Sequence, residues 1–143
     1  MTTQALRFPK DWPKIVKPHF LLGLPFVGAQ GPVYRDLYAQ LATRSDDCWR
    51  QWGEPGRRLN LAHYIAQLLE GECDWPNANL IPEDPFILVA WCHRVYGVVE
   101  DVLNEIEEHV GAKKGSVDWN RFEASTVGEV VDCLLRESKT SGA

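Results

Sequence analysis

Cys92 and His93 are the residues of this chain whose types most suggest nucleophilic chemistry. A cysteine attacks a carbonyl carbon efficiently when a neighbouring base, usually a histidine, takes its proton. Neighbouring residues of a helix point about 100° apart, so these two cannot form that pair with each other. His63, elsewhere in the chain, is the alternative base. One hypothesis is therefore an enzyme with a site near His63, Cys92 and His93, and the competing interpretation is a cysteine packed in an apolar helix.

Metal and nucleotide motifs are missing from the sequence. Glu105 and His109 are four residues apart, whereas di-metal bundles need Glu-x-x-His on two helices. The chain has no CxxC, GxGxxG, GxxxxGK[ST], HExxH or GxSxG pattern. The four widely spaced cysteines are Cys48, Cys73, Cys92 and Cys133. We therefore predict a protein without metal, cofactor or catalysis.

The cysteines and the apolar runs also bear on the compartment. Cys92 and Cys133 lie in apolar helical patterns, where reduced cysteines pack as small hydrophobic side chains. The run from Phe20 to Ala29 imitates a secretion signal, but Gly23 and Pro25 interrupt it. No run approaches the roughly 20 apolar residues that cross a bilayer. We expect a cytoplasmic protein that does not enter membranes.

Charge is unevenly distributed along the chain. The net charge is −5, yet residues 1–17 carry a local charge of +3. Because nucleic-acid affinity comes mainly from neutralising phosphates, the acidic remainder argues against a nucleic-acid partner. The segment 98–110 holds five carboxylates and neither lysine nor arginine; these are Glu100, Asp101, Glu105, Glu107 and Glu108.

Negative charge near a helix C-terminus opposes the helix macrodipole, so a sequence chosen for stability alone would place basic residues there. We predict that Glu100, Asp101, Glu105 and Glu108 form a face that binds a protein partner with a basic surface. The alternatives are a solvated face, or one neutralised by the basic N-terminus of the same chain.

The elements that must position these residues are helical. Five of the nine prolines fall within residues 1–32, which predicts an irregular arm packed on the body. Apolar spacing of three and four residues predicts helices over 33–44, 59–70, 85–110 and 126–137. A short helix capped at Ser45 and a helical turn around 119–122 are also expected. Predicted boundaries are the N-cap Asp84, the stops Gly71 and Gly111, and a Thr126/Glu129 capping box.

These patterns predict an all-α fold: a bundle of four to five helices with an extended, proline-rich N-terminal arm. The expected organisation is the arm over 1–32, one helical domain over 33–138, and a disordered tail over 139–143.

Part of this pattern resembles the acyl carrier proteins. Residues 98–111 are similar to that family's acidic second helix, and residues 119–122 and 126–135 follow it as its short helix and its final helix do. Residues 79–84 resemble the loop before the second helix, and residues 59–71 would correspond to the first helix, so the resemblance covers 59–136. The family carries phosphopantetheine on the serine of Asp-Ser-Leu, but this chain reads Val95-Tyr96-Gly97 there. The resemblance therefore implies a carrier-like domain that lacks the prosthetic group.

Three functional hypotheses follow. The first is a small acidic helical protein-interaction module, such as an adaptor, inhibitor or immunity-type partner, without catalysis. The second is the carrier-like domain without its prosthetic group. The third is the enzyme with a site near His63, Cys92 and His93.

Overall fold

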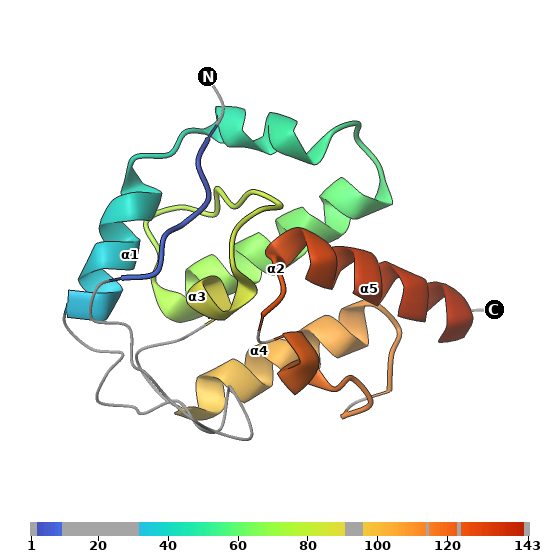
Figure 1. Cartoon of the computed structure of the whole chain (residues 1–143). Helices are drawn as coiled ribbons and strands as arrows, with labels where there is room; N and C mark the ends of the chain where they lie inside the picture. The colour runs from blue at the N-terminus through green and yellow to red at the C-terminus, as the bar shows by residue number, and fades with distance from the viewer. Residues whose placement is uncertain (1–2, 10–31, 91–95, 114, 123, 142–143) are drawn as a thin grey trace.

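The computed structural model describes residues 3–9, 32–90, 96–113, 115–122 and 124–141. The described residues form an all-α fold, as predicted, and contain no strand beyond an isolated antiparallel bridge between Pro85 and Thr126. In chain order the elements are α1 (Pro32–Ala42), the 3-10 helix η2 (Asp46–Trp52), α2 (Arg57–Cys73), α3 (Phe86–Ala90), α4 (Tyr96–His109), the 3-10 helix η3 (Trp119–Phe122) and α5 (Val127–Ser141). Figure 1 shows their arrangement.

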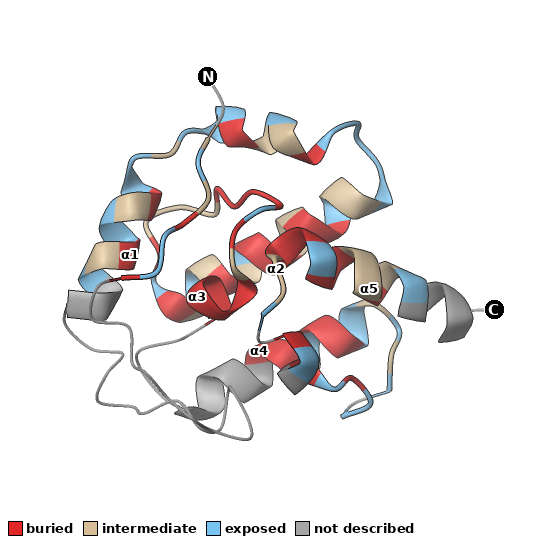
Figure 2. Ribbon diagram, in the orientation of Figure 1, coloured by how far each residue is buried: buried red, intermediate tan, exposed pale blue. Residues whose placement is uncertain are grey.

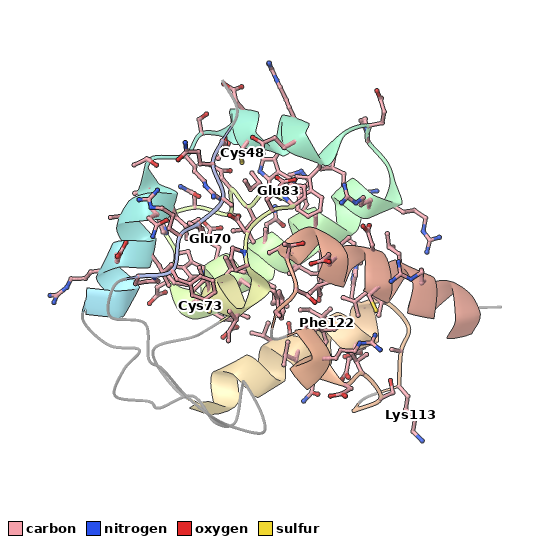
Figure 3. All side chains as sticks on the ribbon, viewed as in Figure 1. Cys48, Glu70, Cys73, Glu83, Lys113 and Phe122 are labelled. Atoms are coloured by element: carbon pink, nitrogen blue, oxygen red, sulfur yellow. The ribbon has the colours of Figure 1, made fainter. Side chains whose placement is uncertain are left out.

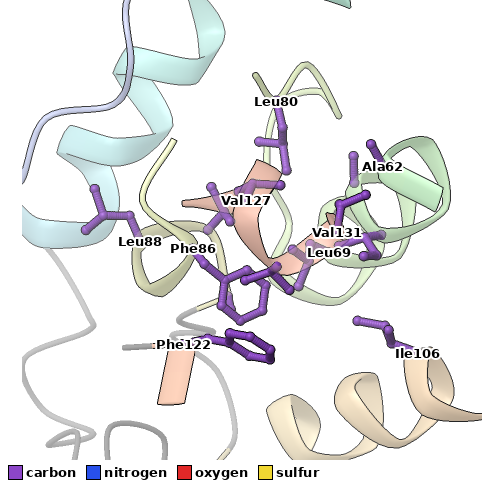
Figure 4. Packing of buried hydrophobic residues seen from close by; sticks show 14 of the residues in the cluster. Ala62, Leu69, Leu80, Phe86, Leu88, Ile106, Phe122, Val127 and Val131 are labelled. Carbon is purple, nitrogen blue, oxygen red and sulfur yellow. The ribbon is translucent and has the colours of Figure 1, made fainter. Parts of the chain in front are cut away.

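The core is built around α2, which packs against α3, α4 and α5. The predicted apolar stripes of the long helices point inward: Ile106 of α4 and Leu134 of α5 are fully buried. Figure 4 shows Phe86 of α3 beside Phe122 of η3. Their rings meet edge to face, with 6.3 Å between the centroids. Burying these apolar surfaces is the main favourable term that holds the helices together.

Three tryptophans attach loops to this core. Trp52, Trp75 and Trp119 are all buried, and each indole N–H donates a hydrogen bond. The acceptors are the carbonyl oxygens of Leu80 and Val89 and the carboxylate of Glu107. A buried indole contributes a large apolar area but needs an acceptor for its N–H. Core packing thus accounts for half of the six tryptophans in the chain.

The first helices differ from prediction at their ends. The short helix predicted after Ser45 exists as the 3-10 helix η2, but Ser45 makes no side-chain capping bond. α2 is longer than 59–70, and Gly71 does not stop it. The helix ends instead at Asp74, in the left-handed conformation with φ of 56°, which Asp tolerates better than most residues. Cys73, in the last turn of α2, is buried in the core. Packing of this turn therefore sets the C-terminal end of α2, against the local preference of Gly71.

The predicted helix over 85–110 corresponds to two elements, α3 and α4, and their connection at 91–95 lies outside the described residues. The predicted stop at Gly111 is confirmed. Gly111 has φ of 82°, and its N–H donates to the carbonyl of Glu108 while that of Ala112 donates to the carbonyl of Glu107. These two bonds form a Schellman motif, which needs a residue with positive φ at the Gly111 position.

The last helix begins as predicted and ends later. The N–H of Thr126 donates to Glu129 Oε1 at 2.8 Å, and the N–H of Glu129 donates to Thr126 Oγ1 at 3.2 Å. This reciprocal pair is the expected capping box. α5 then continues to Ser141, so residues 139–141 belong to a helix rather than to the predicted disordered tail.

Residues 3–9, called the N-terminal segment from here on, have no helical structure and lie along the body beside α1 (Figure 1). Leu6 and Pro9 are buried while Arg7 and Phe8 between them are exposed; Figure 2 maps burial over the fold. The rest of the predicted arm, residues 10–31, lies outside the described residues, and Pro32 already belongs to α1. None of the described helices is long and apolar enough to cross a bilayer.

Candidate functional site

The predicted acidic face lies on α4. Glu105 and Glu108 are exposed, and within the described part of the chain neither forms an ion pair with a basic side chain. The side chains of Glu100 and Asp101 lie outside the described residues. Two of the four predicted partner-binding residues are therefore placed together on the surface, one helical turn apart.

Glu107 lies in the same acidic segment but was not among the four residues predicted for the face, and it does not belong to that face. Its side chain is 1% exposed and accepts three hydrogen bonds. The donors are the N–H of Gly115 at 2.9 Å, the N–H of Val117 at 3.0 Å and Trp119 Nε1 at 3.2 Å. A buried carboxylate is tolerated when such donors replace water. Glu107 thus anchors the loop that leads to η3.

The spacing of apolar residues in the sequence indicates that Glu107 is buried. Glu107 follows Leu103 by four residues and precedes Val110 by three, so it continues the apolar stripe of α4. Glu105 and Glu108 lie off that stripe. A carboxylate in line with core positions is a candidate for burial, and only the tertiary structure supplies its donors.

An aromatic pair borders the acidic face. The rings of Tyr64 and His109 stack at 3.7 Å between centroids, with 7° between their planes. The hydroxyl of Tyr64 donates to the main-chain oxygen of Glu105 at 3.4 Å. Burial, and then the nearby carboxylates of Glu105 and Glu108, raise the pKa of Tyr64. This face therefore combines two exposed carboxylates with a flat aromatic surface.

Asp84 forms a second polar centre, at the end of the loop before α3. Its carboxylate is fully buried and pairs with the guanidinium of Arg44 through two hydrogen bonds of 2.7 Å. It also accepts the N–H of Ile81 and the N–H of Leu6, both at 2.9 Å. Asp84 was predicted as an N-cap; a helix does follow it, but its carboxylate faces the preceding loop and the N-terminal segment instead. A buried carboxylate needs a cation and hydrogen-bond donors to replace water, and Arg44 and the two N–H groups supply these more fully than the start of a helix would.

Cys48, labelled in Figure 3, lies within the electrostatic influence of Arg44 and Asp84, and like Cys73 and Cys133 it forms no disulfide. Burial raises the pKa of Cys48 to about 11, and the negative charge of Asp84 adds to this effect while Arg44 opposes it. The reactive form of cysteine is the thiolate. Cys48 is therefore held as a neutral thiol and is not set up as a nucleophile.

Only His63 of the three residues in the catalytic hypothesis lies within the described structure, so that hypothesis stays untested. His63 stacks on Trp49 at 3.8 Å between ring centroids, with 18° between their planes. Cys92 and His93 lie outside the described residues. Among the residues that are described, no group of three or more His, Cys, Asp and Glu side chains is arranged to hold a metal ion.

Arg58 and Asp132 form an ion pair that the sequence spacing does not indicate. The Nε of Arg58 donates to Asp132 Oδ1 of α5 at 2.8 Å, and its guanidinium lies 5.0 Å from the centre of the Trp52 ring. Both partners of the ion pair are about 40% exposed. Arg58 therefore joins the start of α2 to α5, whereas its neighbour Arg57 is exposed.

Comparison with known proteins returns no family model that matches the chain, and no significant match among curated proteins or solved structures.

Proposed function

We propose that this protein is a non-catalytic protein-interaction module whose acidic face on α4 binds a basic surface of a partner protein. The observation that carries the proposal is the contrast between Glu107 and its neighbours. Glu107 is buried and fully engaged by three donors, whereas Glu105 and Glu108 on the same helix are exposed without a paired cation among the described residues.

Uncompensated charge near a helix C-terminus costs stability, by about 0.3–1 kcal/mol for each well-placed group. A loss of stability of this kind is expected where the charged residues serve binding to a partner and not the stability of the helix. Exposed carboxylates raise the association rate of a basic partner and make it dependent on salt. The Tyr64–His109 stack beside them adds a rigid aromatic surface of the kind enriched in protein interfaces.

The compartment we propose is the cytoplasm. Cys48, Cys73 and Cys133 form no disulfide, and the remaining cysteine, Cys92, lies outside the described residues. Disulfides form and persist mainly in oxidising compartments. Three cysteines outside disulfides fit a reducing environment.

The test is affinity capture from a lysate of the host cell, with the wild type and the double variant Glu105→Lys/Glu108→Lys as baits at low and high salt. We expect the wild type to retain a partner at low salt that the variant loses. The matched control is Asp46→Lys/Glu54→Lys, which changes the charge equally at two exposed positions away from α4. A partner retained equally by all three baits would refute the role of this face, and so would the absence of any retained protein.

A further inference from the structure

The N-terminal segment lies in a groove whose walls carry side chains of α1, η2 and the loop 79–84, and these side chains form hydrogen bonds to its main chain. At the start of the segment, Gln51 Oε1 accepts the N–H of Thr3 at 2.6 Å. Arg44 Nη2 then donates to the carbonyl of Gln4 at 2.8 Å. Both contacts are to atoms that every peptide carries.

The second half of the segment is held in the same way. The buried carboxylate of Asp84 accepts the N–H of Leu6 at 2.9 Å. The side-chain amide of Gln40 accepts the N–H of Arg7 at 2.8 Å and donates to its carbonyl at 3.0 Å. One amide that bonds both main-chain groups of a residue imitates the pairing of a neighbouring β-strand. The groove thus recognises extended main chain at four residues.

Leu6 and Pro9 are the buried residues of the segment. Leu6 is 5% exposed and joins the hydrophobic core, whereas Gln4 and Arg7 are exposed and Phe8 is 53% exposed. A segment held by main-chain bonds and a few apolar anchors can be replaced by another sequence with similar anchors. This combination is typical of sites that bind extended peptides.

The groove is held in shape by bonds that do not involve the segment. Each side chain that contacts the segment's main chain also has a partner on the body, so its geometry survives if the segment leaves. These partners are Asp36 for Gln40 (3.0 Å), Glu83 for Gln51 (3.3 Å), the N–H of Ile81 for Asp84 (2.9 Å), and both Asp84 and the carbonyl of Asn79 for Arg44. A preformed site lowers the ordering cost of binding.

The N-terminal segment does not fill the groove. An open cleft of about 630 Å³ remains between residues 3–7 and the body, and its body wall includes Asp36 and Asp47. Asp47 forms an exposed ion pair with Arg50 at 3.8 Å, which water screens, and the charge of Arg44 in the same wall is balanced by Asp84. The body wall therefore offers two carboxylates to an occupant that brings basic side chains, as the segment does with Arg7.

From these contacts we infer that the groove is a binding site for an extended, basic segment of a partner protein, with an apolar residue in the place of Leu6. The chain's own residues 3–9 are a competing occupant that the partner displaces. The site lies on α1 and η2 and is independent of the acidic face on α4.

The test uses the full-length protein and a fluorescein-labelled peptide with the sequence of residues 1–9, followed by fluorescence anisotropy. The wild type should bind the peptide weakly, because its own segment competes at high effective concentration. The Leu6→Asp variant should bind it at least about tenfold more tightly, since a buried charge weakens the competitor. Gln4→Ala, at an exposed side chain of the same segment, is the matched control and should behave as the wild type.

Changes in the peptide test the chemistry of the occupant. A peptide that carries Leu6→Asp should not bind, and one that carries Arg7→Glu should bind at least about threefold more weakly at low salt. Equal binding of these peptides and the unchanged one would overturn the inference. So would a folded Leu6→Asp protein that binds no peptide, an unfolded one, or a wild-type dimer formed by exchange of the segment, which would assign the groove to a second copy.

Native-state hydrogen exchange tests displacement in the unaltered chain. If the segment detaches as a unit, the amide hydrogens of Leu6 and Arg7 should exchange at least about 100-fold faster than core amides such as that of Ile65 in α2. Exchange of Leu6 and Arg7 only together with global unfolding would show that the segment is an inseparable part of the fold and would overturn the inference.

Discussion

Asp84 and Glu107 are both fully buried carboxylates, yet they are compensated in different ways. Asp84 faces a guanidinium from a residue 40 positions away and two main-chain N–H groups. Glu107 has no cation among its described partners and accepts three N–H groups from residues 8 to 12 positions further along the chain. The first joins distant parts of the fold, and the second shapes one loop.

The two carboxylates should therefore differ in how much stability the fold loses when each of them is removed. Removing Asp84 strands the buried charge of Arg44, whose side chain is 4% exposed. Removing the charge of Glu107 leaves only neutral donors short of an acceptor. An unpaired buried charge is more costly than an unpaired neutral donor.

The largest effect is expected for Asp84→Asn. The substitution keeps the shape of the side chain but leaves Arg44 without its anion, so the free energy of unfolding should fall by about 3–5 kcal/mol. Urea denaturation measures the change. The double variant Arg44→Met/Asp84→Leu should cost less than the sum of its two single variants. Additive costs would show that the pair is not coupled.

A smaller effect is expected for Glu107→Gln. The amide side chain would keep one oxygen acceptor and lose the charge that strengthens the bonds from Gly115, Val117 and Trp119, so we expect a loss of about 1.5–3 kcal/mol. The matched control is Glu108→Gln on the exposed side of the same helix, which should change stability by less than about 0.5 kcal/mol. The comparison fails if the two substitutions cost the same in urea denaturation.

The smallest effect is expected for Asp132→Asn, which removes an ion pair about as short as the buried one. Arg58 and Asp132 are 38% and 42% exposed, so water and salt screen their attraction. The loss should be about 0.2–1 kcal/mol and should shrink further at high salt. A loss as large as that of Asp84→Asn would mean that distance rather than burial sets the value of these pairs.

The fold class and several local features follow from the sequence because they depend on residues close together in the chain. The stripe that contains Ile106, the capping box at Thr126 and the stop at Gly111 are set by spacing within one or two helical turns. Where long-range packing competes with a local signal, the local signal fails. Gly71 looks like a stop, but burial of Cys73 carries α2 past it.

The candidate sites show the same difference between features set by local spacing and features set by long-range packing. Spacing places Glu105 and Glu108 on one face, and composition makes that face acidic. Spacing does not supply the donors of Glu107, and nothing local pairs Asp84 with Arg44, because these partners are fixed only when loops and helices meet. The groove for residues 3–9 has the same origin, since the side chains that hold its main chain come from three separate segments. The sequence determines which side chains are available, and the tertiary structure decides which of them must compensate a buried charge and which remain free to bind.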